Sequence, residues 1–117
     1  MDVDAIIDAA TFADLKHMMG ADFVGELIDT YNQETAALVD QLRQALAAQD
    51  AATFGRCAHS IKSSSASLGA LTFSEQARQL ELTGKTGDLS GAGQRVERLA
   101  ADFALVSRSL EELRDES

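Results

Sequence analysis

The sequence predicts an all-α protein: an antiparallel up-and-down four-helix bundle with a short N-terminal helix. Apolar residues recur every three or four positions along nearly the whole chain, there is no proline, and only 5% of residues are aromatic. A β-sandwich of this size would need many turns and strands rich in β-branched or aromatic residues. A length of 117 residues is that of one domain, so we expect residues 1–117 to form a single helical domain.

The first half of the chain is expected to contain a short helical segment followed by a long helix. Residues 3–19 predict one or two short helical turns, and residues 20–49 predict one long helix. The apolar stripe of the long helix consists of Val24, Ile28, Tyr31, Leu38, Leu42 and Leu46, and it is widened by Phe23 and Leu27.

A second main helix is expected to follow directly, because Asp50 is suited to cap its start and Gly69 to end it. At about 100° per residue, its core side carries Phe54, Cys57, Ala58, Ile61, Ser65 and Leu68. Cys57 is therefore expected to be a packing residue.

The second half of the chain predicts two further helices. A shorter helix carries Leu71, Phe73, Ala77 and Leu80, and residues 83–88 are expected to form a loop. The glycines at 91 and 93 leave the start of the next helix open. The last helix has the most regular apolar pattern, and we expect it to pack in the core rather than to form a dimer; its residues are Val96, Leu99, Phe103, Val106, Leu110 and Leu113.

The charge of the chain restricts its partners. There are 19 acidic and 10 basic residues, giving a net charge of -9. We therefore expect neither nucleic acid nor an anionic membrane as the main partner, because both are polyanions. No apolar run approaches the roughly 18–20 residues that span a bilayer. The acidic start lacks the pattern of a signal peptide, so a cytoplasmic protein is expected.

Several motifs fail on their spacing. Gly84-Lys85-Thr86 resembles the end of a phosphate-binding P-loop, but Gln79 stands where that motif needs glycine. The single cysteine excludes an internal disulfide framework, and His17, His59 and Cys57 lack metal-ligand spacing. We therefore expect no metal site.

The helix that begins after Asp50 has an unusual exposed side. His59 points away from the core side, and its helical neighbours are mostly small, namely Gly55, Ser63 and Ala66, with Arg56 and Lys62 as the long side chains. Glycine and serine lower helix propensity, which suggests clearance for another molecule. On helical-wheel reasoning alone, an ordinary surface histidine is an equally good interpretation.

Local charge supports a site for a small anion. Residues 51–86 contain four basic and two acidic side chains, a net of +2, whereas the remainder carries six basic and seventeen acidic ones, a net of -11. Imidazole is a nucleophile near neutral pH without a helper base. An ammonium one turn away can neutralise phosphoryl oxygens.

Residues 58–70, Ala-His-Ser-Ile-Lys-Ser-Ser-Ser-Ala-Ser-Leu-Gly-Ala, resemble the motif of histidine phosphotransfer (HPt) domains. That motif is a histidine, any residue, an aliphatic, a lysine, a small residue and a serine, followed by a small-rich stretch ending in aliphatic-Gly-Ala. Residues 22–23 and 26–28 at the start of the long helix, and residues 45–46 before Asp50, are also similar. The fold of these domains, a four-helix bundle with a short N-terminal helix, agrees with the periodicity.

The resemblance implies a role for four residues. His59 would accept the phosphoryl group through a ring nitrogen, Lys62 would steady the phosphoryl oxygens, and Ser63 would preserve access where many members have glycine. Glu81 occupies the position where some members place a glutamine that orients the histidine. A carboxylate there would accept from the imidazole N–H but would repel phosphate. The magnesium belongs to the partner, so no cofactor is expected.

The resemblance also implies the partners, which are response-regulator receiver domains or a hybrid sensor kinase. The expected docking residues are Met18, Met19, Phe23 and Leu27, with Gly55, Arg56 and Ala66 at the rim; core packing is an equally good interpretation for each. We expect a monomeric phosphocarrier without ATP-dependent autokinase activity. Two alternatives stay open: a helical adaptor that binds a receiver or kinase without accepting phosphate, and an enzyme that uses His59 as an acid–base group, for which no convergent carboxylate is apparent.

Overall fold

The structure is a computed structural model, and it describes residues 6–115. Within that range the chain is helical and contains no strand. The helices are α2 (Ala9–Met19), α3 (Ala21–Ala47), α4 (Ala51–Ser67), α5 (Leu71–Thr86) and α6 (Ala92–Asp115).

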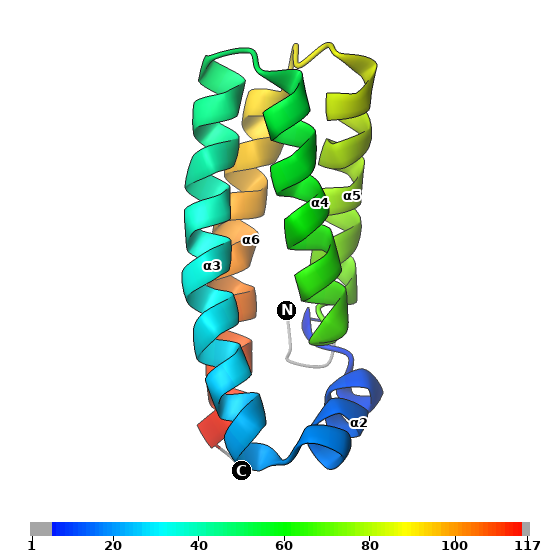
Figure 1. Ribbon diagram of the computed structural model, residues 1–117, viewed down its shortest axis with the longest axis vertical. Helices are drawn as coiled ribbons and strands as arrows, with labels where there is room; N and C mark the ends of the chain where they lie inside the picture. Colours follow the sequence, from blue (N-terminus) through cyan, green and yellow to red (C-terminus); the bar gives the residue numbers. More distant parts are fainter. Residues whose placement is uncertain (1–5, 116–117) are drawn as a thin grey trace.

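Helices α3, α4, α5 and α6 run alternately up and down and form an antiparallel bundle, while α2 lies across its lower end (Figure 1). Each long helix packs on its neighbours in the order α3–α4–α5–α6, and α6 closes the bundle against α3. The predicted all-α four-helix bundle with a short N-terminal helix is therefore confirmed.

The apolar side of each helix supplies the core, as the periodicity predicts. Phe54, Ile28 and Leu110 are completely buried. In α6 the predicted apolar pattern faces the other three helices, with Val96, Leu99 and Val106 buried and Phe103 packed against them. Cys57 is buried as expected.

The boundaries of α4 follow the predicted signals. The side chain of Asp50 accepts a hydrogen bond from the Thr53 backbone N–H at 3.1 Å and so caps the first turn. At the other end Gly69 has φ +90°, a conformation that L side chains rarely adopt. The chain reverses there into α5.

The predicted loop over residues 83–88 is wrong in its first half, because α5 continues to Thr86 and ends at Gly87. Gly84, which suggests a loop in the sequence, is a buried helical residue that contacts Gly55 of α4. The close approach of α4 and α5 leaves room only for glycine at this position. The helix therefore continues through Gly84 despite the low helix propensity of glycine.

The N-terminal segment is more regular than the predicted one or two turns. Helix α2 has 11 residues, and the Asp8 side chain caps it by accepting from the Thr11 backbone N–H at 3.0 Å. The expectation for residues 3–5 lies outside the described residues. The Asp8 backbone N–H donates to the Gly69 carbonyl at 2.7 Å, so the start of α2 is attached to the turn between α4 and α5.

Candidate functional site

His59 lies on the exposed side of α4, and 57% of its side chain is accessible to solvent. Its helix neighbours Ala58 and Ile61 are completely buried, so the backbone that carries the imidazole is fixed by the core. A ring held on a rigid helix needs little further ordering when a partner approaches. The helical wheel predicts this orientation, and the structure confirms it.

The closest contact of the imidazole is with Glu81 on the neighbouring helix α5. The His59 Nδ1 atom lies 2.7 Å from Glu81 Oε2, and the second carboxylate oxygen, Oε1, accepts from Lys62 Nζ at 2.8 Å. The carboxylate thus bridges His59 and Lys62, which are three residues apart on α4. The structure places Glu81 directly beside His59, at the position where the resemblance implies a residue that orients the histidine. Glu81 is thus a carboxylate that contacts His59, which is not apparent from the sequence alone.

The bridging carboxylate is nearly buried, with 9% of its side chain exposed. The hydrogen bond from Lys62 lowers the pKa of Glu81 below its ordinary value, and the hydrogen bond with His59 acts in the same direction, while burial opposes both. Glu81 is therefore ionised at neutral pH. An ionised carboxylate only accepts hydrogen bonds, so the His59 Nδ1 atom carries the proton in this pairing.

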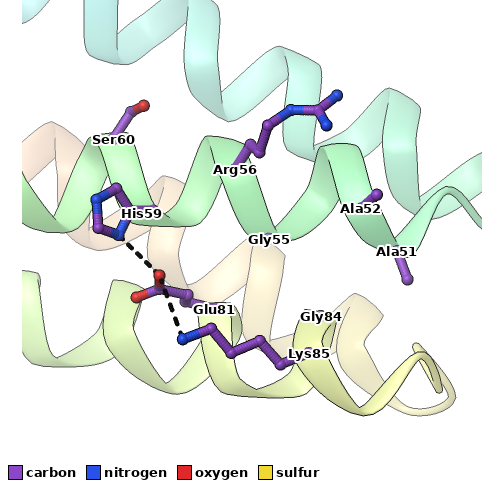
Figure 2. A pocket seen from close by; sticks show the side chains of 9 residues that line it. All are labelled: Ala51, Ala52, Gly55, Arg56, His59, Ser60, Glu81, Gly84 and Lys85. Atoms are coloured by element: carbon purple, nitrogen blue, oxygen red, sulfur yellow. Dashed lines mark hydrogen bonds and ion pairs between the residues drawn. The ribbon is translucent and has the colours of Figure 1, made fainter.

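Assigning the proton to Nδ1 leaves Nε2 with a free lone pair. Figure 2 shows that this second ring nitrogen points away from Glu81 and from the side chains of Arg56 and Lys85. The nitrogen that is free to react is therefore the one directed outward.

An open groove of about 460 Å³ lies between α4 and α5, on the side of the imidazole away from Nε2 (Figure 2). Its floor is made of small residues, and Arg56 and Lys85 lie at its rim (Figure 2). The Lys85 ammonium is 3.9 Å from Glu81 Oε2, while Arg56 donates to the Thr53 hydroxyl at 3.1 Å. The groove is lined by Ala51, Ala52, Gly55, Arg56, His59, Ser60, Glu81, Gly84 and Lys85.

The serines after His59 differ in what they contact. Ser64 and Ser67 donate to backbone carbonyls one turn earlier, at 2.9 and 3.1 Å. The Ser65 hydroxyl is completely buried and shares a hydrogen bond of 2.7 Å with the Tyr31 hydroxyl of α3. Ser63 is exposed, and its hydroxyl contacts no polar partner among the described residues.

The expected docking residues fall into two groups. Met18, Met19 and Phe23 are exposed by 77%, 49% and 47%, around the corner between α2 and α3, whereas Leu27 is half-buried against the core. We call Met18, Met19 and Phe23 the corner patch. Exposure of three large apolar side chains in one place is typical of an interaction surface.

Of the residues expected at the rim, Gly55 and Arg56 line the groove beside His59, whereas Ala66 does not. Gly55 faces the backbone of Glu81 and Gly84, so it serves the contact between α4 and α5 in addition to the open groove. Arg56 borders that groove, and Ala66 is half-buried near the end of α4. The interpretation of Gly55 as pure clearance for another molecule is therefore incomplete.

Comparison with known proteins agrees with this geometry. A family model described as the Hpt domain matches residues 26–116, more than three quarters of the chain and including His59, Lys62 and Glu81. The chain belongs to the Hpt domain family. Its role is histidine phosphotransfer in a phosphorelay, in which Hpt proteins act as phosphocarriers that interact with receiver domains and kinases.

A solved structure supports the same assignment over nearly the full length. The Hpt chain is similar to histidine-containing phosphotransfer protein B (HptB) from Pseudomonas aeruginosa PAO1, with 27% sequence identity and a TM-score of 0.89. The alignment covers 96% of each chain. No curated protein matches the sequence.

Two residues of this Hpt site are not predicted from the sequence. Lys85 and Gly84 lie within the segment that the sequence suggests is a loop. Lys85 and Gly84 follow Glu81 by four and three residues, so they share its helix face in α5, which extends to Thr86. A predicted helix that ends before residue 83 does not include them. Between residues 6 and 115, no helix is long and apolar enough to span a membrane, and no group of three metal-binding side chains gathers.

Proposed function

We propose that His59 is the phosphoacceptor of this Hpt domain and that it reacts through Nε2. The observation that supports this most directly is the 2.7 Å contact between Nδ1 and Glu81, because it fixes the proton on the inner nitrogen and leaves the outer one nucleophilic. The exposed position of the imidazole on a rigid helix favours the approach of a partner aspartyl phosphate.

The reaction is a reversible phosphoryl transfer. The Nε2 lone pair attacks phosphorus, the bond between phosphorus and the aspartate oxygen breaks, and the partner's carboxylate leaves with that electron pair. The imidazole keeps its Nδ1 proton, so the ring gains positive charge beside the Glu81 carboxylate. Glu81 therefore orients the ring and balances the new charge, and it lies on the inner side, away from the arriving phosphoryl oxygens.

Lys62 and Ser63 are assigned to the phosphoryl group. Lys62 Nζ is held by Glu81 in the resting protein, with 28% of its side chain exposed, and it would exchange the carboxylate for the phosphoryl oxygens during transfer. Ser63 is small and exposed one turn after His59, which keeps the path to Nε2 open.

The proposal extends to partners and setting. Receiver domains dock with the corner patch, while Leu27, Gly55, Arg56 and Ala66 lie between or beside the docking surface and the histidine. Residues 1–117 act as one domain, as a monomer in the cytoplasm, and do not phosphorylate themselves from ATP; a phosphorylated receiver or hybrid kinase is the donor.

The direct test is transfer of label from a phosphorylated receiver. The wild-type chain is expected to acquire acid-labile, alkali-stable label, and His59→Gln is expected to acquire none. His17→Gln is the matched control, because His17 is the second of the two histidines and is exposed on α2. Equal labelling of wild type and His59→Gln would refute the assignment, and binding of the receiver without any label would identify an adaptor instead.

A further inference from the structure

The contact between His59 and Glu81 depends on how closely α4 and α5 approach each other. Glu81 and Gly84 are three residues apart on α5, and His59 and Gly55 are four residues apart on α4, so each pair shares one helix face. The Gly55–Gly84 contact therefore lies one turn from the His59–Glu81 hydrogen bond, along the same helix interface (Figure 2).

The backbones at that crossing leave no room for a side chain at position 84. A Cβ atom on Gly84 would lie 2.9 Å from the Gly55 Cα, 3.0 Å from the Gly55 backbone nitrogen and 3.1 Å from the Ala51 carbonyl oxygen. Carbon atoms in contact prefer about 3.5–4.0 Å, so this methyl group would be too close by about 0.6 Å. All three neighbours are backbone atoms of α4, and only movement of one helix away from the other can relieve the contact.

The conformation of Gly84 does not explain why glycine stands there. Gly84 is inside α5 and has no positive φ, so an alanine would adopt its backbone conformation readily and would favour the helix. The only penalty that the structure shows for a side chain is the contact with α4. Glycine at this position therefore maintains the helix separation.

We propose that Gly84 is a positioning residue for phosphotransfer, because it sets the α4–α5 separation at which the Glu81 carboxylate reaches Nδ1 of His59. The inference rests on the proposed role of His59. A side chain at position 84 would move α5 outward, and the 2.7 Å hydrogen bond one turn away would lengthen. The imidazole would then lose the partner that fixes its tautomer, and reaction at Nε2 would slow.

Position 55 on the opposite helix provides an internal contrast. A Cβ on Gly55 would meet the Glu81 carbonyl oxygen at 3.9 Å and the Gly84 Cα at 4.0 Å, which are ordinary contact distances. Gly55→Ala should therefore leave the separation unchanged, although it places the same methyl group on the other side of the same contact. Gly93→Ala on α6 is a second control, since its Cβ would lie 3.9 Å from a Leu46 methyl carbon.

The experiment compares Gly84→Ala, Gly55→Ala and Gly93→Ala by two measurements. The first is the ¹⁵N spectrum of the imidazole rings, in which the His59 signals report the Nδ1–H tautomer and His17 is an internal reference. The second is the rate of label transfer from a phosphorylated receiver. Gly84→Ala is expected to shift the His59 nitrogens toward a mixture of tautomers and to slow transfer about tenfold or more, since displacements near 1 Å can cost up to about 100-fold. Gly93→Ala should match wild type in both measurements, and Gly55→Ala should keep the wild-type Nδ1–H tautomer.

The outcomes separate the inference from the proposed function. Wild-type tautomer and rate in folded Gly84→Ala would overturn the inference, and so would a loss of the Nδ1–H tautomer in Gly55→Ala, or a rate loss in Gly93→Ala, of the same size as in Gly84→Ala. If Gly84→Ala is unfolded, the measurements are repeated in trimethylamine N-oxide, which favours the folded state; failure to fold there would show that Gly84 is needed for folding and would also overturn the inference. If the wild-type chain accepts no label, the proposed function fails, while the ring spectrum still decides whether Gly84 controls the contact.

Discussion

The Lys62 ammonium donates to Glu81 Oε1 at 2.8 Å, so this cation is paired with the same carboxylate that contacts His59. Where a glutamine would leave such a lysine without a charged partner, this chain holds it in an ion pair that is mostly shielded from solvent. In the proposed mechanism, Lys62 exchanges this carboxylate for the phosphoryl oxygens. We therefore expect the Lys62–Glu81 ion pair to affect both the rate of phosphotransfer and the stability of the protein at low pH.

Replacing the lysine should slow transfer without unfolding the chain. Lys62→Ala removes the donor that we propose for the phosphoryl oxygens, and we expect transfer from a phosphorylated receiver to slow about tenfold or more, since single charge-stabilising donors contribute about 10²–10³-fold in other sites. Lys85→Ala is the matched control, because its ammonium is 3.9 Å from the same carboxylate but lies beside the groove, away from Nε2. An effect of Lys85→Ala equal to that of Lys62→Ala would remove the specific role of Lys62.

Glu81 should contribute to stability in a pH-dependent way. Its pKa is lowered in the folded protein, chiefly by the hydrogen bond from Lys62, so its contribution is fully present above its ordinary pKa of about 4.5 and is lost as the pH falls toward the folded value. Melting temperatures measured by circular dichroism between pH 7 and pH 3 should converge for wild type and Glu81→Gln on acidification. The other acids are common to both proteins, so parallel curves would contradict this prediction.

Ser63 should matter for its size rather than for its hydroxyl. Ser63→Ala is expected to transfer within about twofold of wild type, because the hydroxyl contacts no polar partner in the described part of the protein. Ser63→Leu should slow transfer from a receiver about tenfold by obstructing the approach to Nε2. Labelling by phosphoramidate, a small phosphodonor, should persist in Ser63→Leu; loss of both reactions would indicate damage to the imidazole itself.

The corner patch should affect binding and leave stability unchanged. Truncating an exposed apolar anchor in an interface costs about 1–2 kcal/mol, so Met18→Ala and Phe23→Ala should each weaken binding of an unphosphorylated receiver about tenfold in calorimetric titrations. Their melting temperatures should stay close to wild type, because both side chains are exposed. Leu105→Ala, which truncates a leucine exposed by 40% on α6, should bind normally. Equal weakening by Leu105→Ala would show that the patch is not the docking surface.

The sequence predicts most of the bundle because its information is local. The spacing of apolar residues defines the helix faces, and Asp50 and Gly69 mark the ends of α4 through a cap and a positive φ that depend on neighbouring residues. Residues 83–86 are mispredicted as a loop because one sequence does not distinguish a glycine inside a helix from a glycine in a loop. Gly84 is required by its contact with the backbone of α4, which is distant in sequence.

The site could be predicted only in part for the same reason. His59 and Lys62 lie three residues apart on one helix and belong to a recognisable motif, whereas Glu81 joins them across 22 and 19 residues of chain. The resemblance to HPt domains indicates the position of Glu81 but implies that its carboxylate would repel phosphate. The side of the imidazole on which the carboxylate lies depends on how α5 packs against α4, which one sequence does not specify.

The hydrogen bond from the Asp8 backbone N–H to the Gly69 carbonyl has a consequence for how partners are chosen. It ties the helix that carries Met18 and Met19 to the end of the helix that carries His59, so the two lie at one fixed separation. A receiver that rests on the corner patch holds its aspartate near Nε2 at a high effective concentration only when its own dimensions match that separation. Discrimination among receivers would then depend on geometric fit as much as on affinity, and a weak, short-lived complex would be sufficient for transfer.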